Sequence, residues 1–206
     1  MAKFDPDGSG KSTPRARRSE GATRSRQTHD AILAAALEIL EERGYAGFTV
    51  EAVASRARAG KPTIYKWWKS KGALLAEIND HLFAPLFQLP ERGSAEAELE
   101  EYLIIGWSIA RAHPNAVRGA FADAQLDADS ALHLRERFLA RRRTLVRSIL
   151  TRGVARKQLS KRLDVELAAD MFLAYSVFKI LTNETVAKRQ TGEFVRILVR
   201  GFRQAI

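Results

Sequence analysis

The sequence predicts an all-α protein of about nine helices, and three observations carry that prediction. Apolar residues recur three and four positions apart in one segment after another from Thr28 onward. Ser, Thr, Asp or Pro stands at the start of most of these segments, as is typical of helix N-termini. No stretch alternates between apolar and polar residues, and the single Asp-Gly pair, Asp7-Gly8, does not join two apolar runs as it does in a hairpin.

The segment before the first apolar stretch, residues 1–27, is rich in Ser, Gly, Arg and Lys. Because it has almost nothing to bury, it is expected to form a disordered basic arm. The run GSGKS at 8–12 has part of a phosphate-binding loop, but that motif needs glycine where Asp5 stands and a strand before it. We therefore predict no nucleotide site there.

Residues 28–84 predict four helices, the first of which carries its apolar residues at helical spacing from Ile32 to Leu40. Their expected N-caps are Thr28, Thr49, Gly60 and Ser70, and their expected ends are Gly44, Ala57, Trp68 and the residue before Pro85. Five further helices are expected at 94–112, 114–125, 130–157, 164–183 and 191–204. Ser94, Asp164 and Thr191 are the caps expected for three of these, and Pro114 opens another.

The two short helices at 49–57 and 61–68, with a tight turn between them, have the geometry of a helix-turn-helix. In the second, Ile64 and Trp68 share an inward face, while Lys61, Thr63, Lys66 and part of Trp67 point away. Between Glu51 and Glu77 lie six Lys or Arg residues and no carboxylate. Aromatic side chains thus anchor a helix whose cations and hydroxyls face phosphates and base edges, which predicts DNA binding.

Composition excludes several other classes of function. The formal net charge of +10 favours an anionic partner. The absence of cysteine excludes disulfides, thiolate metal sites and cysteine catalysis. The four histidines, His29, His81, His113 and His133, form no ligand-spaced pair, and no nucleophile elbow is present, so we predict no enzyme, metal or cofactor. The longest near-apolar run, 171–178, is too short to span a bilayer, and without a secretory signal the chain is expected to be cytoplasmic.

Residues 28–75 resemble the DNA-binding domain of the TetR family of transcriptional regulators, and read THDAILAAALEILEERGYAGFTVEAVASRARAGKPTIYKWWKSKGALL. The resemblance is carried by Gly44-Tyr45, Thr49 to Ala54, Ala57 to Gly60, Thr63-Ile64-Tyr65, Trp68, and Ser70-Lys71 to Leu75. It implies a helix-turn-helix domain at 28–75, with the motif itself at 49–68, and a helical effector-binding and dimerisation domain at 76–206. The chain departs from the family's pattern at Arg58 and Gly60, where a glycine and a Ser or Thr cap are usual, so the turn is expected to be distorted.

The resemblance also implies roles for single residues. Thr49 and Tyr65 are expected to contact phosphates, residues 61–63 to read bases, and Lys71 to clamp the DNA backbone. Trp67 stands where the family often carries a histidine that touches phosphate. From pattern and resemblance together, the expected DNA-binding residues are Thr49, Arg58, Gly60, Lys61, Pro62, Thr63, Tyr65, Lys66, Trp67 and Lys71.

The C-terminal two-thirds is too long and too apolar to be a tail. By resemblance, the helices at 164–183 and 191–204 form a homodimer contact, and a cavity between helices binds a small apolar or amphipathic effector. The residues expected to line it are His81, Phe83, Phe87, Trp107, Phe138, Arg142, Phe172 and Tyr175. The helix at 70–84 is expected to be the single connection between the cavity and the DNA-binding domain.

These observations predict a transcriptional repressor that a small molecule releases from a palindromic DNA operator. The alternative is a constitutive DNA-binding factor without ligand control. The length of the C-terminal domain argues against that alternative, and a cavity of several hundred cubic ångströms would argue further against it.

Overall fold

A computed structural model describes residues 14–204 of the protein, with side chains from Ser25 onward. These residues form helices joined by short loops and contain no β-strand, which confirms the all-α prediction. The elements are α1 (Pro14–Gly47), α2 (Val50–Ala57), α3 (Lys61–Trp67), α4 (Lys71–Leu82), the 3₁₀ turn η1 (Ala84–Gln88), α5 (Ala95–Ala112), α6 (Pro114–Ala124), α7 (Ala128–His133), the π-helical η2 (Leu134–Leu139), α8 (Ala140–Ala155), α9 (Val165–Leu181) and α10 (Lys188–Arg203).

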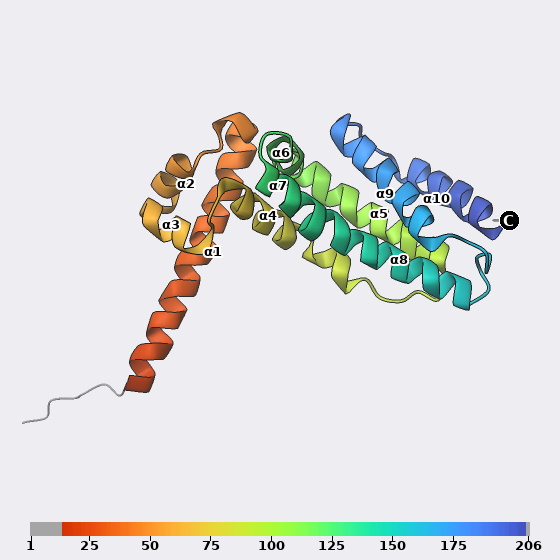
Figure 1. Ribbon diagram of the computed structural model, residues 1–206, viewed down its shortest axis with the longest axis horizontal. Coiled ribbons are helices and arrows are strands. Elements are labelled where there is room, and N and C mark those ends of the chain that lie inside the picture. The colour runs from red at the N-terminus through yellow and green to blue at the C-terminus, as the bar shows by residue number, and fades with distance from the viewer. Residues whose placement is uncertain (1–13, 205–206) are drawn as a thin grey trace, which may run out of the picture.

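The molecule is elongated, with a group of helices at each end (Figure 1). Helices α1 to α3 form one end, and α5, α8, α9 and α10 form a bundle at the other. Between them lie α4, α6 and α7, with α7, η2 and α8 running on as one continuous rod. The described residues therefore contain nine helical rods, as the sequence predicts.

Side-chain caps fix where several of these helices begin. The Thr49 and Ser70 hydroxyls each accept a hydrogen bond from the backbone N–H three residues on, at 3.1 Å. The Ser94 hydroxyl does the same at 3.3 Å, and the Asp164 carboxylate accepts two backbone N–H groups at 3.0 Å. Each bond pairs an N–H that a helix start leaves unpaired. These four predicted caps are confirmed.

Two predicted helix starts are wrong. Helix α1 begins at Pro14 rather than after Thr28, so residues 14–27 of the expected disordered arm are helical. This segment has no proline after its first residue and many good helix formers, so it extends the amphipathic helix that follows. The rest of that arm, residues 1–13, lies outside the described residues. Helix α10 begins at Lys188, and Thr191 is a buried residue of its first turn, bonded to the Ala187 carbonyl.

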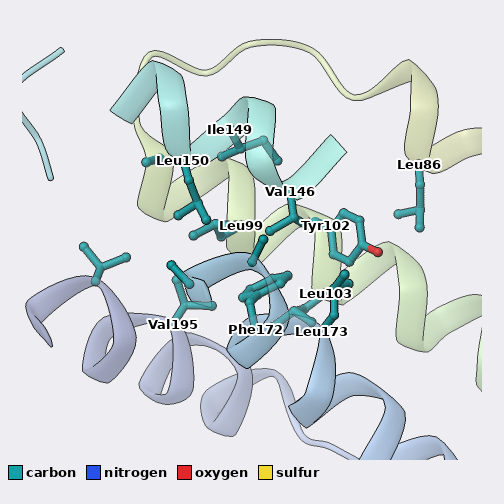
Figure 2. Packing of buried hydrophobic residues seen from close by; sticks show 14 of the residues in the cluster. Leu86, Leu99, Tyr102, Leu103, Val146, Ile149, Leu150, Phe172, Leu173 and Val195 are labelled. Atoms are coloured by element: carbon teal, nitrogen blue, oxygen red, sulfur yellow. The ribbon is translucent and has the colours of Figure 1, made fainter. Parts of the chain in front are cut away.

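Apolar side chains gather in two cores, one at each end of the molecule. The first joins α1 to α4 around Phe48, Ile64 and Trp68. The second fills the bundle around Tyr102 and Phe172, with side chains from α5, α8, α9 and α10 interdigitating (Figure 2). Burial of this kind is the main favourable term for folding.

Helix α6 belongs to both cores. Its Ala116 is buried in the first core, and its Val117 and Phe121 are buried in the second. The α1 residue Glu41 accepts the backbone N–H of Ala116 at 2.7 Å, and its carbonyl accepts the side chain of Asn115 at 2.9 Å. The prediction that α4 alone connects the two regions is therefore wrong, because α6 packs directly on α1 as well.

No helix within residues 14–204 combines the length and apolar character that a membrane crossing needs.

Candidate nucleic-acid interface and effector cavity

The turn between α2 and α3 keeps the shape that a helix-turn-helix requires. Arg58 ends α2 in a left-handed conformation, with φ 51° and ψ 39°. The N–H of Ala59 then reaches back to the Ala54 carbonyl at 3.0 Å. This conformation costs a residue with a Cβ roughly 1 kcal/mol. The expected distortion is absent, and the turn carries an exposed cation where glycine would carry none.

Helix α3 lies in the predicted rotational phase. Ile64 and Trp68 are 1% and 3% exposed, whereas Tyr65 and Trp67 are 44% and 41% exposed. The Trp68 indole also donates a hydrogen bond to Glu77 of α4 at 2.7 Å. The two adjacent tryptophans thus have separate environments, one in the core and one on the surface.

A histidine that the sequence did not single out holds the surface tryptophan in place. The His29 ring stacks on Trp68 at 4.7 Å between centroids and meets Trp67 edge-on at 4.8 Å. Its Nε2 lies 3.0 Å from Glu77. These partners are far apart in the chain and have no common periodicity, so no sequence signal marked the cluster.

The cations around α3 fall into two groups. Lys61 is 2.5 Å from Glu51, and Arg56 is bound by Glu38 and Glu42 at 2.9 and 2.7 Å. The second group has no carboxylate partner among the side chains described here, and it is exposed: Arg58, Lys66 and Lys69. These three cations are free to meet phosphates, and Lys69 is missing from the sequence-predicted set.

Of the remaining predicted DNA-binding residues, Thr49, Gly60 and Pro62 are exposed and Thr63 is half-buried. All four belong to the α2 cap, the turn or the first turn of α3. Gly60 caps α3 without a side chain, and its carbonyl accepts the N–H of Thr63 at 2.9 Å. The structure brings this set together at one end of the molecule, and its contacts with DNA stay a prediction.

Lys71 lies at a joint rather than on the open surface. Its Nζ sits 3.6 Å above the centre of the Tyr45 ring, and burial lowers the pKa of its amine. The Tyr45 hydroxyl donates to buried Asp123 of α6 at 2.5 Å. Burial and this bond raise the pKa of Tyr45 above its usual value. The start of α4, the end of α1 and α6 therefore meet at Lys71.

The C-terminal region contains two neighbouring cavities. The outer cavity, of about 470 Å³, lies among α5, α6, the end of α9 and the start of α10. The inner cavity, of about 30 Å³, lies among α5, η2, α8 and α9. Trp107 and Ile180 line both. The predicted residues that line the inner cavity are Phe83, Trp107, Phe138 and Arg142.

The other four predicted lining residues lie elsewhere. Phe172 is fully buried in the bundle core, and Tyr175 is stacked on Phe194 at 3.8 Å. Phe87 lies outside, under the Arg141 guanidinium at 4.5 Å. His81 borders a separate hollow between α1 and α4. Packing inside the bundle thus takes up two of these four side chains, Phe172 and Tyr175, and the other two lie outside the bundle core.

Family comparisons agree with this architecture. Residues 32–78 match the bacterial regulatory proteins of the tetR family. Residues 89–199 match the tetracyclin repressor-like C-terminal domain. The chain belongs to the TetR family of transcriptional regulators. TetR regulators bind DNA through the helix-turn-helix and are not enzymes.

Similar proteins are regulators as well. The HTH-type transcriptional regulator YdeS of Bacillus subtilis is 29% identical over 181 residues, which cover 87% of this chain and 89% of YdeS. The crystal structure of the TetR family regulator SCO0332 has 28% identity and a TM-score of 0.69, and covers 85% of this chain and 98% of that one. The B. subtilis FadR in complex with stearoyl-CoA has 20% identity and a TM-score of 0.66, over 86% and 99% of the two chains, which shows a shared fold.

Proposed function

We propose that this TetR regulator is a repressor that binds a palindromic operator as a homodimer and is released by a small apolar or amphipathic effector. The observation that carries the proposal is the position of α6. Its Pro114, Val117 and Arg118 line the 470 Å³ cavity, and its other side packs on α1 and α4. The cavity falls within the usual range of 300–1,000 Å³ for small-molecule sites.

The contacts of α6 provide a mechanical route from the cavity to the DNA. Glu41 and Asp123 tie α6 to α1, and Asn79 of α4 donates to the Ala116 carbonyl at 3.2 Å. An effector that shifts α6 therefore shifts α1 and the start of α4 together. That motion changes the separation of two recognition helices, which must lie about 34–36 Å apart to read successive half-sites.

An apolar stripe on α9 supports the homodimer. Its members are exposed at intervals of three and four residues: Leu167, Met171, Ala174, Phe178 and Leu181. Ile197 of α10 is 63% exposed. By contrast, Phe202 is buried and Phe194 stacks on Tyr175 within the same subunit. An unpartnered stripe of this length is typical of an interface between copies. A repressor that binds operator DNA acts in the cytoplasm, which is the location we propose.

The test uses the full chain and an operator selected from random duplex DNA. Compounds that raise the melting temperature are first found in a set of apolar and amphipathic molecules, and their affinities are then measured with and without saturating operator. An effector must bind more weakly in the presence of operator, by the same factor by which it weakens DNA binding, typically 5–150-fold. Equal affinities would favour the alternative, a constitutive DNA-binding factor.

A further inference from the structure

The inner cavity has an uncommon set of walls. Three buried polar atoms on its lining residues have no hydrogen-bond partner: Arg142 Nη2, Trp107 Nε1 and Ser176 Oγ. Buried donors are nearly always paired, and each unpaired one costs about 1–3 kcal/mol. Three such atoms around one cavity indicate a ligand that accepts hydrogen bonds.

Arg142 is the strongest of the three. It is 6% exposed, and its Nη1 donates to the Phe138 carbonyl at 2.7 Å. Its guanidinium lies 3.4 Å from the Phe138 ring centre and 4.0 Å from that of Phe83. No carboxylate pairs with it among residues 25–204, unlike its neighbours Arg141 and Arg143, which pair with Asp80 and Asp170. Burial lowers the pKa of Arg142 to about 10, so the side chain still carries its charge at neutral pH.

We propose that the inner cavity binds the carboxylate of the effector, with Arg142 as its counter-ion and Trp107 and Ser176 as further donors. This proposal rests on the proposed function and names the class of effector: an organic acid with one carboxylate and an apolar body.

Charge and size favour a carboxylate over a phosphate. Arg142 is the only cationic residue on the described lining of the inner cavity, so it balances one negative charge. At about 30 Å³ the cavity holds about two water molecules or a group of that size.

The apolar body has room in the outer cavity. Trp107 and Ile180 are walls of both spaces, so the two cavities adjoin, and the proposal requires the ligand to extend from Arg142 past these two side chains. Beyond that point the outer cavity offers Ile104, Val117 and Val186. A molecule in this position contacts α6 at Val117, and α6 in turn packs on α1 of the DNA-binding region.

The experiment compares acids with the alcohols of the same carbon skeleton. Calorimetry on the full chain measures octanoate, decanoate and 4-phenylbutyrate, each against its alcohol. We expect at least one acid to bind about tenfold or more tightly than its alcohol, the scale of one charge-assisted hydrogen bond. Arg142→Met should reduce that ratio to about one, and Arg143→Met, which removes a surface charge one residue away, should leave it unchanged.

Two milder variants guard against a folding defect in Arg142→Met. Trp107→Phe and Ser176→Ala each remove one unpaired donor, so melting temperatures should stay level or rise while the acid-to-alcohol ratio falls about threefold. Equal affinity of every acid and its alcohol, no binding by any acid, or an acid preference that survives in folded Arg142→Met would each overturn the proposal. If alcohols bind and release the operator as well as acids do, ligand control stands and the carboxylate site falls. If acids bind at Arg142 without weakening DNA binding, the carboxylate site stands and ligand control of DNA binding is contradicted.

Discussion

Helices α1 to α3 and the rest of the molecule differ in where they place polar groups. In α1 to α3, cations and hydroxyls lie on the surface, and no buried side-chain nitrogen or oxygen described there lacks a partner. In α4 to α9 the described side chains include seven buried atoms without a hydrogen-bond partner. Three of them, on Trp107, Arg142 and Ser176, belong to the lining of the inner cavity. The others belong to Asn79, His113, Asp123 and Arg152, and the Arg152 Nε lies 3.6 Å from Glu91.

This difference separates two ways of carrying a function. A DNA-binding surface must present charge to a large partner, so its core can be fully apolar and its helices firmly fixed. A small-molecule site must withdraw its ligand from water, so its polar groups are buried and remain unpaired until the ligand binds. We expect the first end to fail mainly through lost packing and the second through changed polar contacts.

The largest effect is expected at the packed end. Trp68→Ala removes a buried ring and its bond to Glu77, and should lower the free energy of unfolding by roughly 3–5 kcal/mol. Trp67→Ala, at 41% exposure, should cost less than about 1 kcal/mol. Urea unfolding of both variants checks this. If the exposed position proves the costlier one, the rotational phase of α3 is wrong.

The second prediction tests whether two copies of the chain dimerise through α9. Phe178→Glu places a charge on the exposed stripe of α9 and should give monomers, with operator affinity reduced about 100-fold or more as one half-site is lost. Leu126→Glu is the control, because Leu126 is 75% exposed and lies outside the stripe. Sedimentation that shows an intact Phe178→Glu dimer moves the interface elsewhere.

Sequence reasoning was most accurate where short-range rules apply. Caps such as Ser70 and the phase of Ile64 and Trp68 depend on residues within one or two helical turns, and both were predicted. It was least accurate where distant segments meet. The His29 cluster, the α6–α1 contact at Glu41 and the walls of the cavities depend on helix packing, which periodicity does not specify. Arg142 is the exception, since an arginine on an apolar helix face is visible in sequence.

A third prediction concerns a buried carboxylate that is fully paired. Glu98 is 2% exposed and accepts bonds from Arg152 at 2.6 Å and Arg156 at 3.0 Å. Burial alone would raise the pKa of Glu98, but these bonds outweigh it and hold the pKa below its usual value. Glu98→Gln should cost about 2 kcal/mol at pH 7, less than a fully buried pair, because both arginines are partly exposed.

The pH dependence has a definite sign. The lowered pKa means that the charged form stabilises the fold above the unfolded value, about 4.5, and that this stability is lost as pH falls through the folded value. The gap in unfolding free energy between wild type and Glu98→Gln should therefore shrink below pH 4.5. A gap that stays constant down to the acid transition would contradict the pairing.

A fourth, smaller effect is expected at the joint between the two ends. A Cβ on Gly72 would lie 2.1 Å from the Ser130 hydroxyl and 2.7 Å from Asp123 Oδ2. Gly72→Ala should cost about 1–2 kcal/mol through overpacking and should weaken the coupling between effector and operator. Gly201→Ala, which has open space around its Cβ, should be neutral or stabilising. Equal melting temperatures for the two variants would show that α4 is not closely packed against α6 and α7 there.

The smallest effect separates free from paired cations at the DNA-binding end. Lys66 is exposed without a described carboxylate partner, so Lys66→Ala should weaken binding to all duplexes alike and reduce the salt slope by about one unit. The pair of Lys61 and Glu51 has no net charge, so the double variant Glu51→Gln/Lys61→Met should leave that slope nearly unchanged. Anisotropy titrations with operator and random duplexes at several salt concentrations measure both slopes.

An unchanged slope for Lys66→Ala removes this lysine from the interface. A drop of about one unit for the double variant would mean that DNA draws Lys61 away from Glu51, and that the free charge of α3 is set by the complex rather than by the fold.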